Sequence, residues 1–457
     1  MSLSSQGVKL AGVAAIALAL VPAAPAVAAT VSVKGTDLSF RAGRGEANRV
    51  RLDLKAKVVT VKDSGARVKA GRGCKSASSH QVVCRKRKSD FDRYKVALGD
   101  RGDRATLVQR GGAELGSPEV AGGPGDDVIS AARLKRFGFF SGGDGDDRIT
   151  GTKDADPIRG GAGRDVLIGG KGDDQFYPDP SGSAVANDVV NGGPGLDSVD
   201  YSVRAKPVSI DLRRSSPQGS AGEKDVFHSV EGAIGTTGDD TLLGNGAEND
   251  MQGIDGRDVI AGYAGDDRVW GGGGDKADTA PDKISAGSGA DTVLTEAGGT
   301  ATGGPGNDDF QGGGSLDGGD GDDTFEPSGG EVKCGNGDDS VAIRDVTPPV
   351  LTACETVQLG ANDELPINLP LERGENAIVA HILGCDQEDG PTPDGDLCAN
   401  ELKVSLGEQL LASGTYDATE SGDTLQMPYR EGAKEALGTD PKQVLTTIGK
   451  FSFYSSL

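Results

Sequence analysis

Aromatic side chains are scarce in this sequence: one Trp, seven Tyr and eleven Phe stand among 457 residues. A conventional core of large side chains therefore cannot run through the whole chain. Histidine is rarer still, and His80, His228 and His381 are scattered singly, with no Cys-x-x-Cys anywhere, which argues against a zinc site. Basic residues are outnumbered, 47 against 70 acidic ones, and the net charge of −23 argues against nucleic acid as a partner.

Catalytic motifs are also missing from the sequence. It contains no Gly-x-Ser-x-Gly, no His-Glu-x-x-His and no Gly-Lys-Ser or Gly-Lys-Thr of a phosphate-binding loop. Carboxylates abound, but no pair of them stands out as an acid and a base. We therefore expect that the protein is not an enzyme.

Long apolar runs are confined to the first thirty residues. Lys9 precedes the run LAGVAAIALALVPAA, and Ala26-Val27-Ala28 has the small-x-small pattern of a cleavage site. We interpret residues 1–28 as a secretory signal peptide, with a membrane anchor as the alternative. No later run reaches about 18 apolar residues, so we expect no transmembrane segment in the mature chain and a secreted, extracellular or cell-surface location.

The six cysteines agree with an oxidising compartment. They occur as three close pairs, and six cysteines allow 15 connectivities, of which three local disulfides are the most economical. The expected pairs are Cys74 with Cys84, Cys334 with Cys354, and Cys385 with Cys398.

Charge divides the mature chain into three predicted domains. Residues 29–121 carry about +11, residues 122–360 about −24, and residues 361–457 about −11. The first and last domains alternate apolar and polar residues, which is typical of strands, so we expect a small N-terminal β domain and a C-terminal β-sandwich-like domain. Within the first, the tripeptide Arg101-Gly102-Asp103 resembles an adhesion motif, but a chain this rich in Gly and Asp produces such a tripeptide by chance.

The middle domain is repetitive. Residues 142–177 divide into four units of nine, GGDGDDRIT, GTKDADPIR, GGAGRDVLI and GGKGDDQFY, and residues 235–270 divide into four more. Each unit has a Gly-rich turn, an acidic residue at its sixth place and usually an apolar residue at its eighth. A Gly-rich disordered linker is the alternative interpretation, but a linker has no need of a regularly placed apolar residue.

Two units form one coil of a parallel stack, because each supplies one short strand and one turn. Units 18 residues apart then lie directly over one another, which places Asp147 against Asp165 and Asp156 against Asp174. Carboxylates at that spacing repel unless a cation lies between them, and a ligand set made only of oxygen favours calcium over softer metals. We therefore predict several calcium ions that hold successive coils together.

The predicted metal ligands are the acidic or amide residues at these places. They are Asp127, Asp147, Asp156, Asp165, Asp174, Asp188, Asp197, Asp240, Asn249, Asp258, Asp267, Asp291, Asp308, Asp323 and Asp339. Lys276 occupies the sixth place of one unit, where we expect a weak or empty site. Beyond residue 286 the acids lie 15 to 17 residues apart, so we expect only one side of each coil to keep a calcium turn.

These nonapeptides resemble the hemolysin-type, or RTX, calcium-binding repeat of exported actinobacterial proteins. The resemblance implies a parallel β-roll, an RTX β-helix, with calcium between the turns and the sixth-place Asp as a ligand. A stretch at about 198–234 is similar to an interruption found between such repeats. Two functions remain open: a calcium-binding structural protein of the cell exterior, or an adhesion or carbohydrate-binding protein that displays its terminal β domains to a cell-envelope polymer or glycan.

Overall fold

The protein is all-β, as expected. The computed structural model describes residues 28–456, except 87–89, 112–114, 180–185, 216, 273–280, 297, 344–348, 353, 355, 361–365, 369–370, 374–376, 383–398, 407–408, 418–422, 429–442 and 449–450. Within this described part there is no helix long and apolar enough to cross a membrane. The predicted signal peptide, Lys276 and the pair Cys385 and Cys398 lie outside it.

The first sheet extends along the molecule from the N-terminal strands to residue 368. In spatial order it contains β5 (Val68–Ala70), β1 (Ala29–Lys34), β2 (Asp37–Arg41), β8 (Arg93–Ala97), β10 (Ser117–Pro124), β12 (Phe139–Asp144), β14 (Pro157–Ala162), β16 (Gln175–Tyr177), β18 (Ser198–Asp200), β22 (Gly232–Ile234), β24 (Asp250–Ile254), β26 (Arg268–Gly272), β28 (Thr292–Thr295), β30 (Asp309–Gly312), β32 (Thr324–Pro327), β34 (Ser340–Ile343), β36 (Thr356–Gly360) and β37 (Pro366–Asn368). Apart from β1 with β2 and β36 with β37, its neighbours are parallel.

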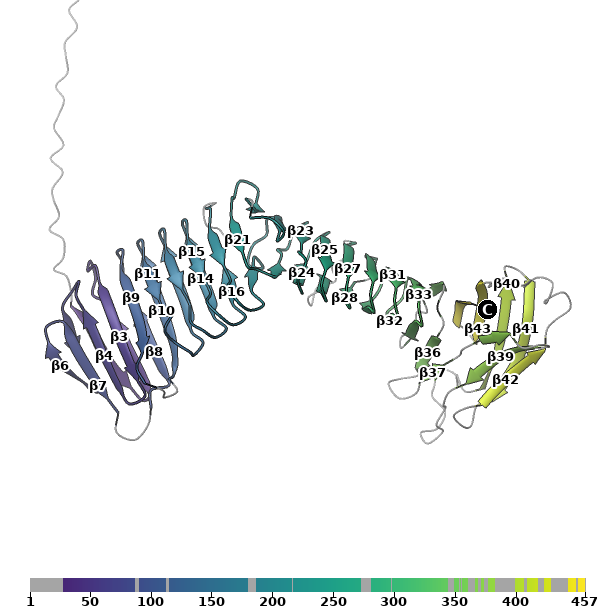
Figure 1. Ribbon diagram of the computed structural model, residues 1–457, viewed down its shortest axis with the longest axis horizontal. Helices are drawn as coiled ribbons and strands as arrows, with labels where there is room; N and C mark the ends of the chain where they lie inside the picture. The colour runs from purple at the N-terminus through teal and green to yellow at the C-terminus, as the bar shows by residue number, and fades with distance from the viewer. Residues whose placement is uncertain are drawn as a thin grey trace, which may run out of the picture.

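Two further sheets share the opposite side of the stack. The second sheet contains β6 (Cys74–Ser78), β7 (Gln81–Arg85), β4 (Val58–Asp63), β3 (Arg49–Lys55), β9 (Arg104–Gln109), β11 (Val128–Ser130), β13 (Arg148–Thr150), β15 (Val166–Ile168), β17 (Val189–Asn191) and β21 (Val226–His228). The third contains β20 (Gly219–Ser220), β19 (Val208–Asp211), β23 (Thr241–Leu243), β25 (Val259–Ala264), β27 (Lys283–Ser288), β29 (Thr300–Pro305), β31 (Ser315–Asp320), β33 (Glu331–Asn336) and β35 (Val350–Thr352). The stack changes direction near β21 and β23, where the second sheet gives way to the third (Figure 1).

The pairing register confirms that one coil comprises 18 residues in the first block of repeats. Phe140 pairs with Ile158, which pairs with Phe176, and Ile149 pairs with Leu167 on the other side. Successive strands of the chain thus alternate between the two faces, as the nonapeptide pattern predicts.

The core of the repeats is a row of single apolar side chains, one from each short strand. The apolar residue at the eighth place is buried wherever the repeat occurs, as in Ile149, Leu167, Ile260 and Phe310. Burial of one such side chain contributes about 1.5–3 kcal/mol. Phe310 also stacks on Phe325 one coil away, with ring centroids 4.8 Å apart. The core is thin, so much of the cohesion must come from the turns.

The sheets continue across the boundary predicted at residue 121. β8 and β9 pair in parallel with β10 and β11, and their apolar side chains join the same core as those of the repeats. The N-terminal strands are therefore the first layers of the roll rather than a separate β domain. The change in the sign of the net charge near residue 121 does not mark a domain boundary. Charged side chains are mostly exposed, whereas the continuity of the stack depends on the buried apolar side chains.

The segment 198–234 also contributes layers instead of leaving the stack. Its strands β18 and β22 extend the first sheet, and β21 closes the second. After the roll, β38 (Leu371–Arg373), β39 (Ala377–Ile382) and β42 (Asp423–Pro428) form one antiparallel sheet. A second antiparallel sheet contains β41 (Gln409–Asp417), β40 (Ala399–Leu406), β43 (Gln443–Ile448) and β44 (Phe451–Ser456).

Candidate metal centre

Acidic and amide side chains form three columns along the turns, one for each sheet. The first column precedes the strands of the first sheet and contains Asp156, Asp174, Asp197, Glu231, Asn249, Asp267, Asp291, Asp308, Asp323 and Asp339. The second precedes the strands of the second sheet and contains Asn48, Asp103, Asp127, Asp147, Asp165, Asp188 and Asp225. The third contains Asp240, Asp258 and Asp282.

One hydrogen bond repeats along each column. The backbone N–H of Asp147 donates to Oδ1 of Asp165 at 2.8 Å, and that of Asp156 donates to Oδ1 of Asp174 at 2.8 Å. The same bond joins Asp240 to Asp258 and Asn249 to Asp267. The predicted stacking of units 18 residues apart is confirmed in all four cases.

The second carboxylate oxygen is buried and has no hydrogen-bond partner in many turns. This holds for Oδ2 of Asp103, Asp127, Asp147, Asp165, Asp174, Asp188, Asp197, Asp267, Asp291, Asp308 and Asp323. An ionised oxygen in that state costs several kcal/mol unless a cation or a donor meets it. The columns therefore have the property expected of a cation site: buried negative charge that the protein itself leaves uncompensated.

The glycine at the first place of most repeats makes room for this oxygen. A Cβ on Gly142 would collide with Oδ2 of Asp147 and lie 2.6 Å from the carbonyl oxygen of Gly160 in the next coil. Gly303 faces the corresponding pair, Oδ2 of Asp308 and the carbonyl oxygen of Gly318. Each such turn thus brings a carboxylate oxygen and a carbonyl oxygen from adjacent coils to one place.

Two further glycines keep the coils close together. Gly143 has φ of 127° and Gly145 has φ of 136°, values that L side chains rarely adopt. A Cβ at either position would also strike the backbone of the turn one coil before, at Gly123 and Gly125 respectively. Glycine is therefore required here both for the conformation and for the approach of neighbouring turns.

The donor set fits a hard cation. Among the residues that the structure describes, no three His, Cys, Asp or Glu side chains converge on one point, so carbonyl oxygens must supply part of any coordination shell. Calcium accepts six to eight oxygens from carboxylates, carbonyls and water in flexible geometry. In the part of the chain that the structure describes, the stacked turns offer mainly carboxylate and carbonyl oxygens, which suits calcium.

Burial raises the pKa of the column carboxyl groups, because a buried carboxylate loses its water. The pKa of Asp147 rises to about 6, that of Asp165 to about 8 and that of Asp188 to about 9. The nearby Asp147 carboxylate adds to the shift of Asp165, and Asp179 adds to that of Asp188, while backbone N–H donors oppose it. Without a cation, the column carboxyl groups with the highest pKa, such as those of Asp165 and Asp188, favour protonation near neutral pH.

Five column residues were missed from the sequence: Asn48, Asp103, Asp225, Glu231 and Asp282. Asp103, whose tripeptide we attributed to chance, accepts the backbone N–H of Asn48 while its own N–H donates to Asp127 at 2.7 Å. Its turn begins with Leu98 where a repeat has glycine, which hid the match. Asp282 receives the N–H of Asp258 and continues the third column after the stretch that contains Lys276.

At the end of the second column, a hydroxyl group and a guanidinium contact the buried carboxylates. The Tyr201 hydroxyl donates to Oδ2 of Asp225 at 2.6 Å, and the Arg204 guanidinium pairs with Asp179 at 2.8 Å and Glu223 at 2.6 Å. All five side chains are almost wholly buried. Here the chain supplies its own positive charge and hydroxyl donor where the repeats leave carboxylates open.

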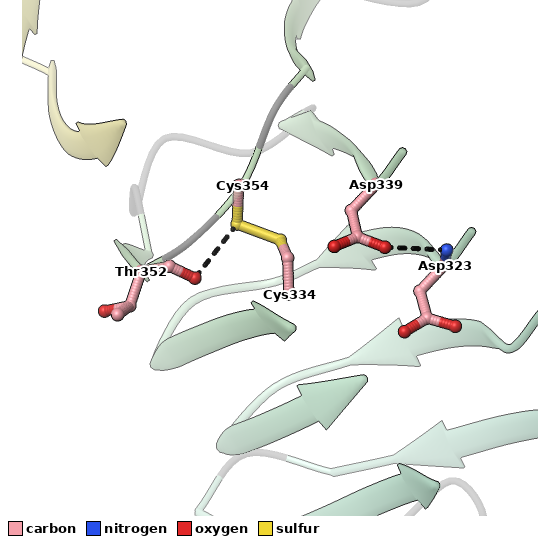
Figure 2. Close-up of a disulfide and its surroundings, with 5 residues drawn as sticks. All are labelled: Asp323, Cys334, Asp339, Thr352 and Cys354. Carbon is pink, nitrogen blue, oxygen red and sulfur yellow. Dashed lines mark hydrogen bonds between the residues drawn. A yellow bond between two sulfur atoms is a disulfide. The ribbon is translucent and has the colours of Figure 1, made fainter. Parts of the chain in front are cut away.

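The first column ends beside a disulfide. Cys334 occupies the first place of the last repeat and is bonded to Cys354, and the N–H of Asp323 donates to Asp339 at 2.9 Å in the adjoining turn (Figure 2). The predicted Cys74–Cys84 disulfide is also present and joins β6 to β7. Beyond β27, the strands β29, β31 and β33 have no column acid before them, so only the first column continues, as the spacing predicted.

The fold and the turns define a parallel β-roll with oxygen-lined turns. The family model of the RTX calcium-binding nonapeptide repeat matches residues 141–176, 252–275 and 277–299, in four copies. The chain therefore contains calcium-binding nonapeptide repeats of the RTX type. No curated protein matches the chain.

Proposed function

We propose that the protein is a secreted or cell-surface structural protein whose roll folds around calcium and is stiffened by it. The observation that carries this proposal is the row of buried Oδ2 atoms without partners, most of which lie beside a carbonyl oxygen of an adjacent coil. A cation at these places would neutralise the carboxylates and join the coils at the same time. The proposal includes no catalytic role.

The thin core explains why such a protein needs the ion. Each short strand of the repeats buries one apolar side chain, while most turns of the columns bury a carboxylate whose charge is repelled by neighbouring carboxylates. Ion binding that occurs only in the folded state adds its free energy to folding. At 100 times the dissociation constant, one site contributes about 2.7 kcal/mol.

A calcium titration tests the proposal directly. Far-ultraviolet circular dichroism of the purified chain should gain β signal as calcium rises through roughly 0.1–1 mM, the range of weak extracellular sites. Equilibrium dialysis should then count several bound ions, on the order of five to ten if most stacked pairs are filled. A spectrum that is the same with calcium and with chelator would sink the proposal.

A glycan-binding role is the second candidate, and one surface feature supports it. A hollow of about 550 Å³ lies on the outer face of the first sheet, where Phe139 is half exposed and the Arg159 guanidinium covers the Tyr177 ring at 4.8 Å. Aromatic rings beside Gln175 and Arg159 combine an apolar surface with hydrogen-bond donors, as sugars require. If F139A leaves binding on a glycan array unchanged, or no glycan binds, this candidate fails.

A further inference from the structure

One turn of the first column is shorter than its neighbours. Six residues (192–197) connect β17 to β18 and six (244–249) connect β23 to β24, whereas three residues (229–231) connect β21 to β22. The short turn passes through Ser229, whose φ of 47° is unusual for a residue other than glycine. It lies in the segment between the two blocks of nonapeptide repeats, which no matched repeat covers.

The missing length leaves a cavity of about 80 Å³ between the layers. Its lining residues include four acidic ones, one arginine and one asparagine: Asp197, Glu231, Glu248, Asp250, Arg268 and Asn249. The formal charge of this lining is −3. Arg268 pairs with Glu248 at 2.8 Å, and both side chains are largely exposed, so this ion pair lies at the rim. Among the other acidic residues of the lining, Asp197 is buried and Glu231 is partly buried.

Glu231 takes the place of the column aspartate in this layer. Its Oε2 accepts the backbone N–H of Asp197 at 3.0 Å, and its carbonyl oxygen accepts the Asn249 side-chain amide at 2.9 Å. Asp197 itself is fully buried, and its Oδ2 has no hydrogen-bond partner. The carbonyl oxygen of Ser229 lies next to this Oδ2, since both crowd the position that a Cβ on Gly192 would occupy.

We propose that this cavity is a calcium site in which Glu231, a residue outside the nonapeptide repeats, is a carboxylate ligand together with Asp197. A water molecule needs roughly 10–15 Å³ of such space, so the cavity has room for an ion and several waters. Calcium accepts water as part of its shell, which suits a site where the turn is too short to supply all the carbonyls. An ion here joins the layers on either side of the place where the second sheet gives way to the third.

The site rests on the proposed calcium-dependent function and extends it to the turn at Glu231, which has no nonapeptide, so its test must separate the two. In E231Q the side chain keeps an oxygen that accepts the Asp197 N–H but loses its charge. Equilibrium dialysis of the full chain should count one calcium fewer in E231Q than in the unchanged protein. E331Q, at an exposed glutamate that begins β33, is the matched control and should bind as many ions as the unchanged protein.

A second variant is expected to act in the opposite direction. R268Q removes the one cationic side chain among the described residues of the lining, so the calcium affinity of this one site should rise several-fold. Hydrogen exchange reports the site locally: calcium should slow exchange in peptides that span 193–200 and 229–234 in the unchanged protein and in E331Q, but not in E231Q.

The outcomes are distinguishable. If the unchanged protein binds no calcium, the proposed function and this site fail together. If it binds calcium but E231Q retains the full count, the same affinities and the same local protection, the cavity holds only water and the inference is overturned. If E231Q loses its β signal even in calcium, R268Q decides the matter, because an unchanged or lower affinity in that variant also contradicts the site.

Discussion

Asp147 donates its backbone N–H to Oδ1 of Asp165 one coil further along, while Oδ2 of both side chains is buried without a partner. The carboxylate thus has two separate tasks: one oxygen fixes the register of adjacent turns, and the other is left open to a cation. Because the first task does not need a charge, an Asn substitution separates the two.

Asp147→Asn is therefore expected to preserve the stack but weaken calcium binding. The amide oxygen can still serve as a hydrogen-bond acceptor, whereas the lost charge weakens the ion bound there. In saturating calcium the free energy of unfolding should fall by about 1–3 kcal/mol, and in chelator the change should be much smaller. Urea denaturation under both conditions measures this difference.

Asp146→Asn is the matched control, since Asp146 is the adjacent residue of the same turn. Its carboxylate is exposed and pairs with Arg164 at 2.7 Å, an interaction that water and salt screen strongly. Its effect should not depend on calcium. Equal calcium dependence in the two variants would mean that the buried position has no special role.

Gly142→Ala tests whether the buried carboxylate of Asp147 needs the space that this glycine leaves. The added Cβ would collide with Oδ2 of Asp147, so either the carboxylate or the turn must move. We expect a loss of roughly 2–4 kcal/mol in stability and a weaker calcium response. Gly246→Ala is the control, because its added Cβ meets no atom within 4 Å, and it should change stability by less than about 1 kcal/mol. A similar loss in both variants would mean that the space at Gly142 has no special role.

The pH dependence of stability should reverse with calcium. The pKa of Asp165 and Asp174 in the folded protein is raised to about 8, above the ordinary value of 3.8, so without calcium the folded state binds more protons than the unfolded state between these values. This contribution is fully present below about pH 4 and is lost as the pH rises through 8. With calcium, deprotonation favours the ion, so stability should rise over the same range.

Guanidinium denaturation at pH 5, 6.5 and 8 checks both trends in one experiment. The chelated protein should become less stable at each step, and the calcium-saturated protein more stable. A chelated protein that gains stability between pH 5 and 8 would show that the column carboxylates are ionised and compensated by the chain itself.

Much of the roll was predictable because its pattern is local. The place of Ile149 or Leu167 follows from the nonapeptide alone, and the stacking of Asp156 on Asp174 follows from two units per coil. Asp103 and Glu231 could not be found in that way. The turn of Asp103 begins with Leu98 where a repeat has glycine, and the turn of Glu231 is three residues shorter than its neighbours. Neither turn matches the nonapeptide pattern, so only the pairing of the strands shows that Asp103 and Glu231 belong to the columns.

Arg204→Gln is expected to destabilise the roll equally with and without calcium. The guanidinium is buried between Asp179 and Glu223 and lies over the Tyr201 ring at 4.7 Å, so its removal leaves two buried carboxylates without their cation. Loss of one partner from a buried ion pair costs about 3–5 kcal/mol. Arg257→Gln, which breaks the exposed pair with Asp239, should cost less than about 1 kcal/mol. If saturating calcium restores the stability of Arg204→Gln, an ion can replace the guanidinium, and the second column does not end in a calcium-independent cluster.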